Sequence, residues 1–351
     1  MWGPLRNWFG KARTVNAPAV PRMPEPVPQR EVVSVALPVV APGPEPLPVF
    51  DRALDCRFSA LLLSLRTLRE AEFAPAEKVV IIQLDELLHI RGNRELLPRL
   101  PAVLPKLMSL VRRDDVSPRE LVAHLARDPA LVSEVIRIAN SPRYRASRSM
   151  GSLQDAVMVL GQRGMHQLVT NVAMRPVFNM EMGRFSRAAR AHLWEQASRC
   201  AHACSYLRGG RSDQFDAYLA GMVVNAGLIP ALRVLDQNYV GCSAPDTVAF
   251  HEAFLKLSLR ISANIAKEWN FPEGVSQAVE ALSAEPKVAA SVHLAAELRA
   301  ADQVSKRHLL ATTNAMAPAG GEDDADPCFQ ELDRVFGGGR ESLRDEPVRA
   351  I

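Results

Sequence analysis

The chain has 351 residues, of which 48% are hydrophobic and 23% are charged, a mix typical of a globular protein with a core. A net charge of +3 and an aromatic content of 6% exclude a strongly basic nucleic-acid binder and a base-stacking platform. No apolar run approaches the ~20 residues of a membrane-spanning helix, and five cysteines make no disulfide framework, so we expect a cytoplasmic protein without transmembrane helices.

Both ends of the chain have the composition of disordered segments. Of the 26 prolines, 11 lie within residues 1–50, where they remove backbone donors and favour extended geometry. Residues 310–351 are rich in small and acidic side chains. We therefore expect a disordered proline-rich arm at the start and a mostly disordered acidic tail at the end, with a short helix near 329–336.

Residues 51–94 are expected to form a short helical segment ahead of the main domain. Apolar residues recur at helical spacing in two places, at Phe58 and Leu62 and again at Val80 and Leu84. Amphipathic helices bury such faces either within one chain or against a second copy. The sequence therefore leaves the oligomeric state open.

Capping residues mark the starts of the next helices. Ser117 and Glu120 match a capping box, in which side chains satisfy the free N–H groups of the first helical turn. Asp128 and Ser152 stand in the same position before two more apolar periodic segments. Gly161 interrupts the last of these segments and predicts a tight corner there.

Helical patterns dominate the second half of the chain as well. The spacing of apolar residues predicts helices over 186–207, 213–235, 245–269, 273–283 and 285–309. No run of alternating β-branched residues is long enough for a sheet. The predicted fold class is therefore all-α.

Segments that follow one another from residue 97 to residue 283 resemble the HDOD domain, the HD-related output domain of bacterial signalling proteins. They include LPRLPAVLP at 97–105, SLQDAVMVLG at 152–161, AGMVVNAGL at 220–228 and ANIAKEWNFP at 263–272. The resemblance implies a compact multi-helix HD-like domain, which we place over residues 95–309. It also implies a domain without catalytic activity.

The related HD phosphohydrolases bind divalent metals through a His, a His-Asp pair and a distant Asp, and the metal activates water. The resemblance places the first His at Gln196 and the His-Asp pair at Val224 and Asn225. Val224 has no donor atom and amides are weak neutral ligands, so we expect no metal, no cofactor and no enzymatic activity. A divergent metal-dependent phosphohydrolase is the alternative, with ligands drawn from His192, His202, His251, His293 and Asp236.

A turn rich in arginine is the other candidate site. Arg143, Arg145 and Arg148 lie within nine residues of chain, and we expect Arg163 nearby. Guanidinium groups suit phosphate and carboxylate, so these four residues are candidates for binding an anion or a partner. A nucleotide-binding sensor without turnover is a second alternative, and arginines solvated on a loop are the plain interpretation.

No other catalytic signature stands out in the sequence. It contains no phosphate loop, no dinucleotide-binding glycine motif after a strand and no nucleophile elbow. The expected function is that of a bacterial signal-transduction protein. Its non-catalytic helical domain would act as a scaffold that binds a protein partner.

Overall fold

The computed structural model describes residues 51–89, 97–111, 117–141, 150–179, 183–283, 293–313 and 325–337. The chain divides into two units, residues 1–45 and 46–351, and every described residue belongs to the second unit. The proline-rich arm and most of the acidic tail lie outside the described residues.

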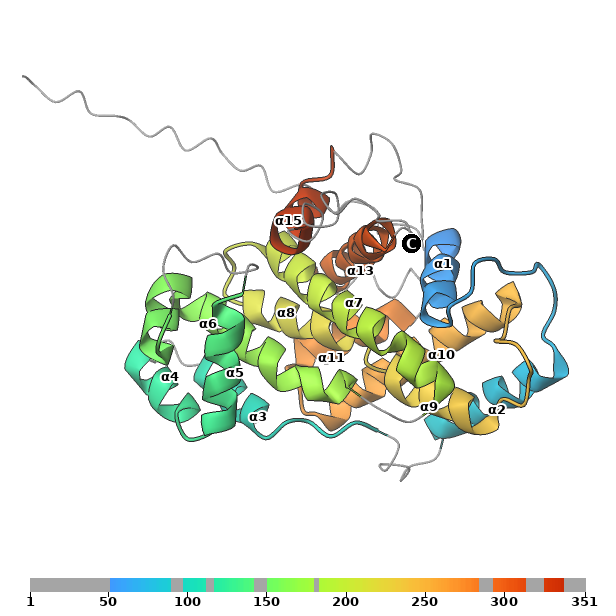
Figure 1. The fold of residues 1–351 in the computed structure, drawn as a ribbon, viewed down its shortest axis with the longest axis horizontal. Coiled ribbons are helices and arrows are strands. Elements are labelled where there is room, and N and C mark those ends of the chain that lie inside the picture. Colours follow the sequence, from blue (N-terminus) through green and yellow to red (C-terminus); the bar gives the residue numbers. More distant parts are fainter. Residues whose placement is uncertain are drawn as a thin grey trace, which may run out of the picture. The chain divides into compact units, whose positions relative to one another are not determined.

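The regular elements of the described chain are helices, which confirms the predicted all-α class (Figure 1). The first half forms α1 (Arg52–Leu62), α2 (Pro75–His89), α3 (Val103–Val111), α4 (Pro118–Leu125), α5 (Pro129–Ala139) and α6 (Leu153–Phe178). The second half forms α7 (Arg184–Arg208), α8 (Gln214–Val223), α9 (Leu228–Asn238), α10 (Val248–Glu268), α11 (Glu273–Ser283), α13 (His293–Thr312) and α15 (Pro327–Phe336).

The predicted helix starts are confirmed by their capping bonds. Ser117 Oγ accepts a hydrogen bond from the backbone N–H of Glu120 at 3.2 Å, at the start of α4. Asp128 and Ser152 cap α5 and α6 in the same way, at 3.0 and 3.1 Å. Each cap satisfies one otherwise free N–H and stabilises its helix by about 1 kcal/mol.

The corner predicted at Gly161 is present as a bend inside α6. Gly161 has φ +68° and ψ 174°, whereas helical geometry resumes after it. A side chain is strained in this left-handed region, and glycine adopts it without cost. The bend divides α6 into a short first part and a longer second part, from which Asn171 Nδ2 donates to Ser198 Oγ of α7 and Arg163 donates to Gln214 of α8.

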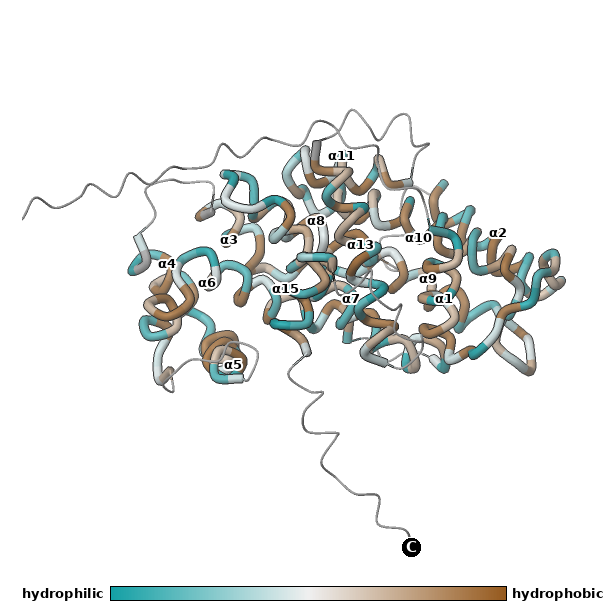
Figure 2. The backbone as a smooth tube through the Cα atoms, turned by 90° about the horizontal axis from the view of Figure 1, so that it is seen from above, coloured by the Kyte–Doolittle hydropathy of each residue, from teal (hydrophilic) through white to brown (hydrophobic). Residues whose placement is uncertain are grey.

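Helix α7 organises the core of the domain. It packs against α8 and α13 and also contacts α1, α9 and α15. Small buried residues on α7, including Ala197, Cys200 and Ala201, allow neighbours to approach closely. A Cβ atom added at Gly221 of α8 would lie 2.5 Å from the carbonyl oxygen of Cys200. Hydrophobic (brown) and hydrophilic (teal) stretches are interspersed along the tube in Figure 2.

The single helix predicted over 213–235 is wrong, because the chain turns at residues 224–227 between α8 and α9. At the turn, Gly227 lies against α10, where an added Cβ would be 2.0 Å from the carbonyl oxygen of Ser258. The stretch 214–238 is long and apolar enough to cross a membrane, but 94% of its most apolar window is buried inside the domain. It is therefore packed as a core element.

The predicted helical segment before the main domain consists of α1 and α2. Helix α1 packs against α7, α10 and α13, and α2 packs against α9 and α10. The buried carboxylate of Glu77 in α2 accepts bonds from Thr247 Oγ1 at 2.6 Å and from the backbone N–H of Asp246 at 3.1 Å. Both helices thus share the core of the later helices.

The short helix expected near 329–336 is confirmed as α15. It begins at Pro327 after the N-cap Asp326 and packs on α7 and α13. Phe329 and Leu332 of this helix are buried in the core. The described part of the chain beyond residue 310 therefore includes one ordered helix.

Candidate functional site

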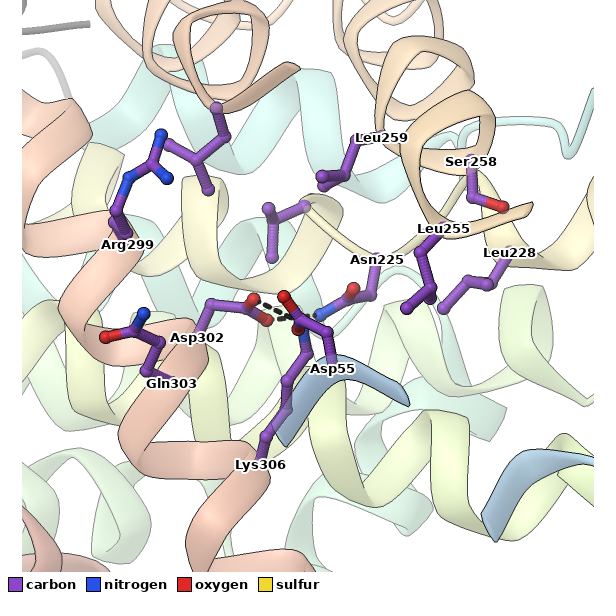
Figure 3. A pocket seen from close by; sticks show the side chains of 12 residues that line it. Asp55, Asn225, Leu228, Leu255, Ser258, Leu259, Arg299, Asp302, Gln303 and Lys306 are labelled. Atoms are coloured by element: carbon purple, nitrogen blue, oxygen red, sulfur yellow. Dashed lines mark hydrogen bonds and ion pairs between the residues drawn. The ribbon is translucent and has the colours of Figure 1, made fainter. Parts of the chain in front are cut away.

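Helix α13 brings two oppositely charged side chains into the core. Asp302 and Lys306 lie one turn apart, and Lys306 Nζ is 2.5 Å from Asp302 Oδ2. The same ammonium is 2.6 Å from Oδ1 of Asp55, which comes from α1. Figure 3 shows the two carboxylates converging on the ammonium group. All three side chains are at least 90% buried.

Two amide side chains complete this site. Asn225, from the turn after α8, donates from Nδ2 to Asp302 Oδ1 at 2.8 Å. Gln196 of α7 donates from Nε2 to Asp302 Oδ1 at 3.2 Å and to Ser305 Oγ at 2.8 Å. We call the group the Lys306 cluster; it comprises Asp55, Gln196, Asn225, Asp302 and Lys306.

The charges of the cluster fix its protonation. Burial alone would lower the pKa of Lys306, but the attraction of Asp302 and Asp55 outweighs burial and raises that pKa. Burial raises the pKa of Asp55, and the nearby ammonium opposes this shift. Lys306 is therefore a permanent internal cation, bound by the two carboxylates.

Arg299 lies on α13 one turn before Asp302 and is 7% exposed. In Figure 3 its side chain extends away from the ammonium of Lys306. Burial lowers the pKa of Arg299, and the fields of Asp302 and Asp55 oppose that shift. The two basic side chains thus balance the formal charge of the two acidic ones.

The Lys306 cluster does not fit a divalent metal. Gln196 and Asn225 direct NH₂ groups at Asp302, and a nitrogen that carries those protons donates hydrogen bonds and cannot ligate a metal. Val224 supplies no donor atom, and both carboxylates already hold the ammonium. Gln196 Oε1 has no hydrogen-bond partner among the described residues, but it is a neutral amide oxygen and a weak ligand.

The space beside the cluster is small. The cavity has a volume of about 30 Å³ and is walled by Leu228, Leu255 and Leu259 as well as by the polar residues. One water molecule needs roughly this volume, whereas sites for small molecules measure roughly 300–1,000 Å³. The cavity therefore has no room for a substrate.

Two of the alternative metal ligands, His251 and Asp236, bond to other groups. His251 is fully buried and its ring nitrogens bond Ser59 Oγ at 2.7 Å and the carbonyl of Pro245 at 3.1 Å. Asp236 accepts from the backbone N–H of Phe185 at 2.7 Å at the start of α7. Searched over the described segments, no three His, Cys, Asp or Glu side chains gather as a metal site.

Of the four candidate arginines, the structure describes Arg163. Arg143, Arg145 and Arg148 lie outside the described residues. Arg163 is exposed on α6, two residues after the bend, and its Nη1 donates to Gln214 Oε1 at 3.3 Å. It lines a pocket between α6 and the start of α8, which we call the Arg163 pocket.

The helical fold and the buried polar site on α13 define a domain of the HD type. The family model of the HDOD domain matches residues 97–284, more than half of the chain. The chain therefore belongs to the HDOD domain family, as the sequence resemblance predicted.

Solved structures agree with this fold. An HDOD domain protein from Geobacter sulfurreducens has a TM-score of 0.50 and 19% identity, covering 75% of this chain and 90% of that chain. A candidate metal-dependent phosphohydrolase from Shewanella amazonensis SB2B has the same TM-score and identity, covering 75% of this chain and 98% of that chain. At this level of identity the two likenesses show the fold alone.

One curated protein is similar to part of the chain. An uncharacterized protein of Treponema pallidum (strain Nichols) is 25% identical over 193 residues. The match covers 51% of this chain and 36% of the relative. The chain thus spans little more than a third of that relative's length.

Several residues of the site were missed from the sequence. Asp55, Asp302 and Lys306 were not singled out, although 285–309 was predicted as a helix that contains the last two. Their spacing of four residues is also that of an ordinary surface ion pair on a helix. Their burial distinguishes them from a surface ion pair. This burial depends on the packing of α1, α7 and α13, which are distant from one another in the sequence.

Proposed function

We propose that this chain is a non-catalytic regulatory protein of bacterial signal transduction, whose HDOD domain acts as a scaffold that binds a protein partner. The observation that supports the proposal best is the Lys306 cluster. In HD phosphohydrolases a metal cation is held by a His, a His-Asp pair and a distant Asp. Here the cation is the ammonium of Lys306, with Asp302 as the distant carboxylate.

Replacement of the metal by an ammonium group would also explain why Gln196, Val224 and Asn225 stand at the positions of metal ligands. A covalently attached ammonium needs hydrogen-bond acceptors, which Asp55 and Asp302 supply, and it needs no imidazole ligands. Gln196 and Asn225 then serve as amide donors to the carboxylate oxygens of Asp302. An ammonium cannot lower the pKa of a bound water as a divalent metal does. The cluster stabilises the domain and leaves hydrolysis without a nucleophile.

A charge-neutral variant tests the proposal. The substitutions Asp55→Asn, Asp302→Asn, Lys306→Met and Arg299→Met remove the formal charges of the Lys306 cluster and of the neighbouring Arg299 together, so that no unpaired charge is left buried there. We expect the variant to fold and to restore the transcript profile of a strain that lacks the gene. A folded variant that fails to restore the profile would contradict a scaffold role.

Metal content and hydrolysis provide the second measurement. The wild-type chain, purified without chelator and incubated with manganese and iron, is expected to retain no stoichiometric metal. It should also leave bis-p-nitrophenyl phosphate uncleaved. Stoichiometric metal, together with cleavage that the charge-neutral variant loses, would establish the alternative of a divergent phosphohydrolase.

The partner is tested with the same pair of proteins. Wild type and the charge-neutral variant, used as separate baits, should enrich one common protein from the source bacterium. That protein, once purified, should bind both baits with similar affinity in isothermal titration calorimetry. Failure of the purified pair to bind would refute the scaffold proposal.

A further inference from the structure

The Arg163 pocket has the size of a ligand site. Its volume is about 670 Å³, within the roughly 300–1,000 Å³ of sites that hold small molecules. Residues at the Gly161 bend form one wall, and the other is formed by Arg211, in the connection from α7, and by Phe215 at the start of α8. The pocket is separate from the Lys306 cluster, with which it shares no lining residue.

The pocket is positively charged. Arg163 and Arg211 line it, and none of the described residues in its wall is acidic. Arg163 donates to the neutral Gln214, and the nearest carboxylate to Arg211 is Glu297, at 3.8 Å from Nη1. Glu297 Oε1 is already bonded to Arg208 at 2.7 Å. Each guanidinium carries five N–H donors, so most of them face solvent or the pocket.

A buried histidine supplies an independent observation. His166 lines the pocket, is 4% exposed, and its Nε2 has no hydrogen-bond partner among the described residues. Leaving a buried polar atom unpaired is costly unless a ligand or water satisfies it. Phe215 packs edge-on to His166, with ring centroids 5.9 Å apart, and adds an apolar aromatic wall.

We propose that the Arg163 pocket binds a phosphorylated small molecule of about nucleotide size. Its phosphate would bind Arg163 and Arg211, whose planar guanidinium groups match phosphate oxygens in pairs. Its ring system would lie toward Phe215 and His166, where an unpaired nitrogen is available for one hydrogen bond. The inference stands apart from the scaffold role, because a ligand site and a partner surface occupy different residues.

Isothermal titration of the full chain tests the site, with 5′-AMP, 5′-GMP, ribose 5-phosphate and inorganic phosphate as probes. We expect at least one mononucleotide to bind with 1:1 stoichiometry and to bind more tightly than ribose 5-phosphate or phosphate. The double variant Arg163→Ala/Arg211→Ala should weaken that binding about 100-fold, because it removes two charge-assisted contacts. Phe215→Leu should weaken the mononucleotide and leave phosphate unchanged.

A matched control separates the site from net charge. Arg57→Ala/Arg66→Ala removes two exposed arginines that do not line the pocket and should leave binding unchanged. No binding of any probe at millimolar concentration would overturn the proposal. Binding that survives Arg163→Ala/Arg211→Ala would also overturn it, and equal affinity for phosphate and mononucleotides would refute the role of the aromatic wall.

Discussion

The Lys306 cluster and the Arg163 pocket are polar sites of opposite design. In the cluster, each carboxylate meets the ammonium within 2.6 Å, and the adjoining cavity holds about one water molecule. In the pocket, Arg163 and Arg211 have no carboxylate in the wall, and the cavity is more than twenty times larger. The charges of the Lys306 cluster pair with one another, whereas the arginines of the Arg163 pocket can pair with a bound ligand.

This difference shows which charges in the domain are suited to stability and which are suited to binding. Charges buried in a low-dielectric core must be paired, because the free energy of desolvation is large. Exposed charges need no partner to remain in the folded protein, so they are available to a ligand. The paired charges of the Lys306 cluster are thus suited to a structural role, and the exposed arginines of the Arg163 pocket are suited to binding.

The largest expected effect comes from removing the cation of the Lys306 cluster alone. Lys306→Met leaves Asp55 and Asp302 buried without their partner, which should lower the free energy of unfolding by about 3–5 kcal/mol. The charge-neutral variant, which also replaces Arg299, should stay within about 1–2 kcal/mol of wild type, because neutral replacements avoid the unpaired charge. Urea denaturation followed by circular dichroism measures both values. Equal stability of Lys306→Met and wild type would show that the ammonium does not hold the carboxylates.

Local features of the fold were predictable because their causes are local. The cap at Ser152 and the bend at Gly161 depend on residues within one helical turn. The turn at 224–227 was not predictable from apolar spacing, which continues through it without a break. Its cause is distant: Gly227 fits against α10, and Asn225 reaches Asp302 on α13.

Lowering the pH is expected to have an intermediate effect on the stability of the fold. Burial lowers the pKa of His166 to about 4, below the value of about 6.5 in an unfolded chain. Between these values the unfolded chain binds more protons, so stability falls as the pH drops from 6.5 to 4. His251, also with a pKa of about 4, contributes in the same window. His166→Leu should therefore reduce the slope by up to about 1.4 kcal/mol per pH unit.

Urea denaturation between pH 7 and pH 4 measures this slope. The control is Met158→Leu, which replaces an exposed residue that carries no titratable group and should leave the slope unchanged. A slope that His166→Leu does not alter would show that His166 is not held neutral by burial.

Candidate site residues were predictable only where they follow one another in the sequence or match a family pattern. Gln196 and Asn225 were selected by the resemblance, and the structure brings both to Asp302. Arg211 and His166 carry no sequence signal, because an exposed arginine and a buried histidine are both common. Their role depends on the approach of α6 to α8, which tertiary packing alone defines.

The smallest expected change in the free energy of unfolding comes from replacing the arginines of the Arg163 pocket. Arg163→Ala removes an exposed charge that donates to a neutral amide, and Arg211→Ala removes one whose carboxylate partner, Glu297, also binds Arg208. Each should therefore change the free energy of unfolding by less than about 0.5 kcal/mol. Urea denaturation at low and at high salt provides the measurement. A loss comparable to that of Lys306→Met would mean that the pocket arginines stabilise the fold, and would leave them no free charge for a ligand. Unchanged stability, together with lost affinity for the mononucleotide probe, is the pattern that only a binding site produces.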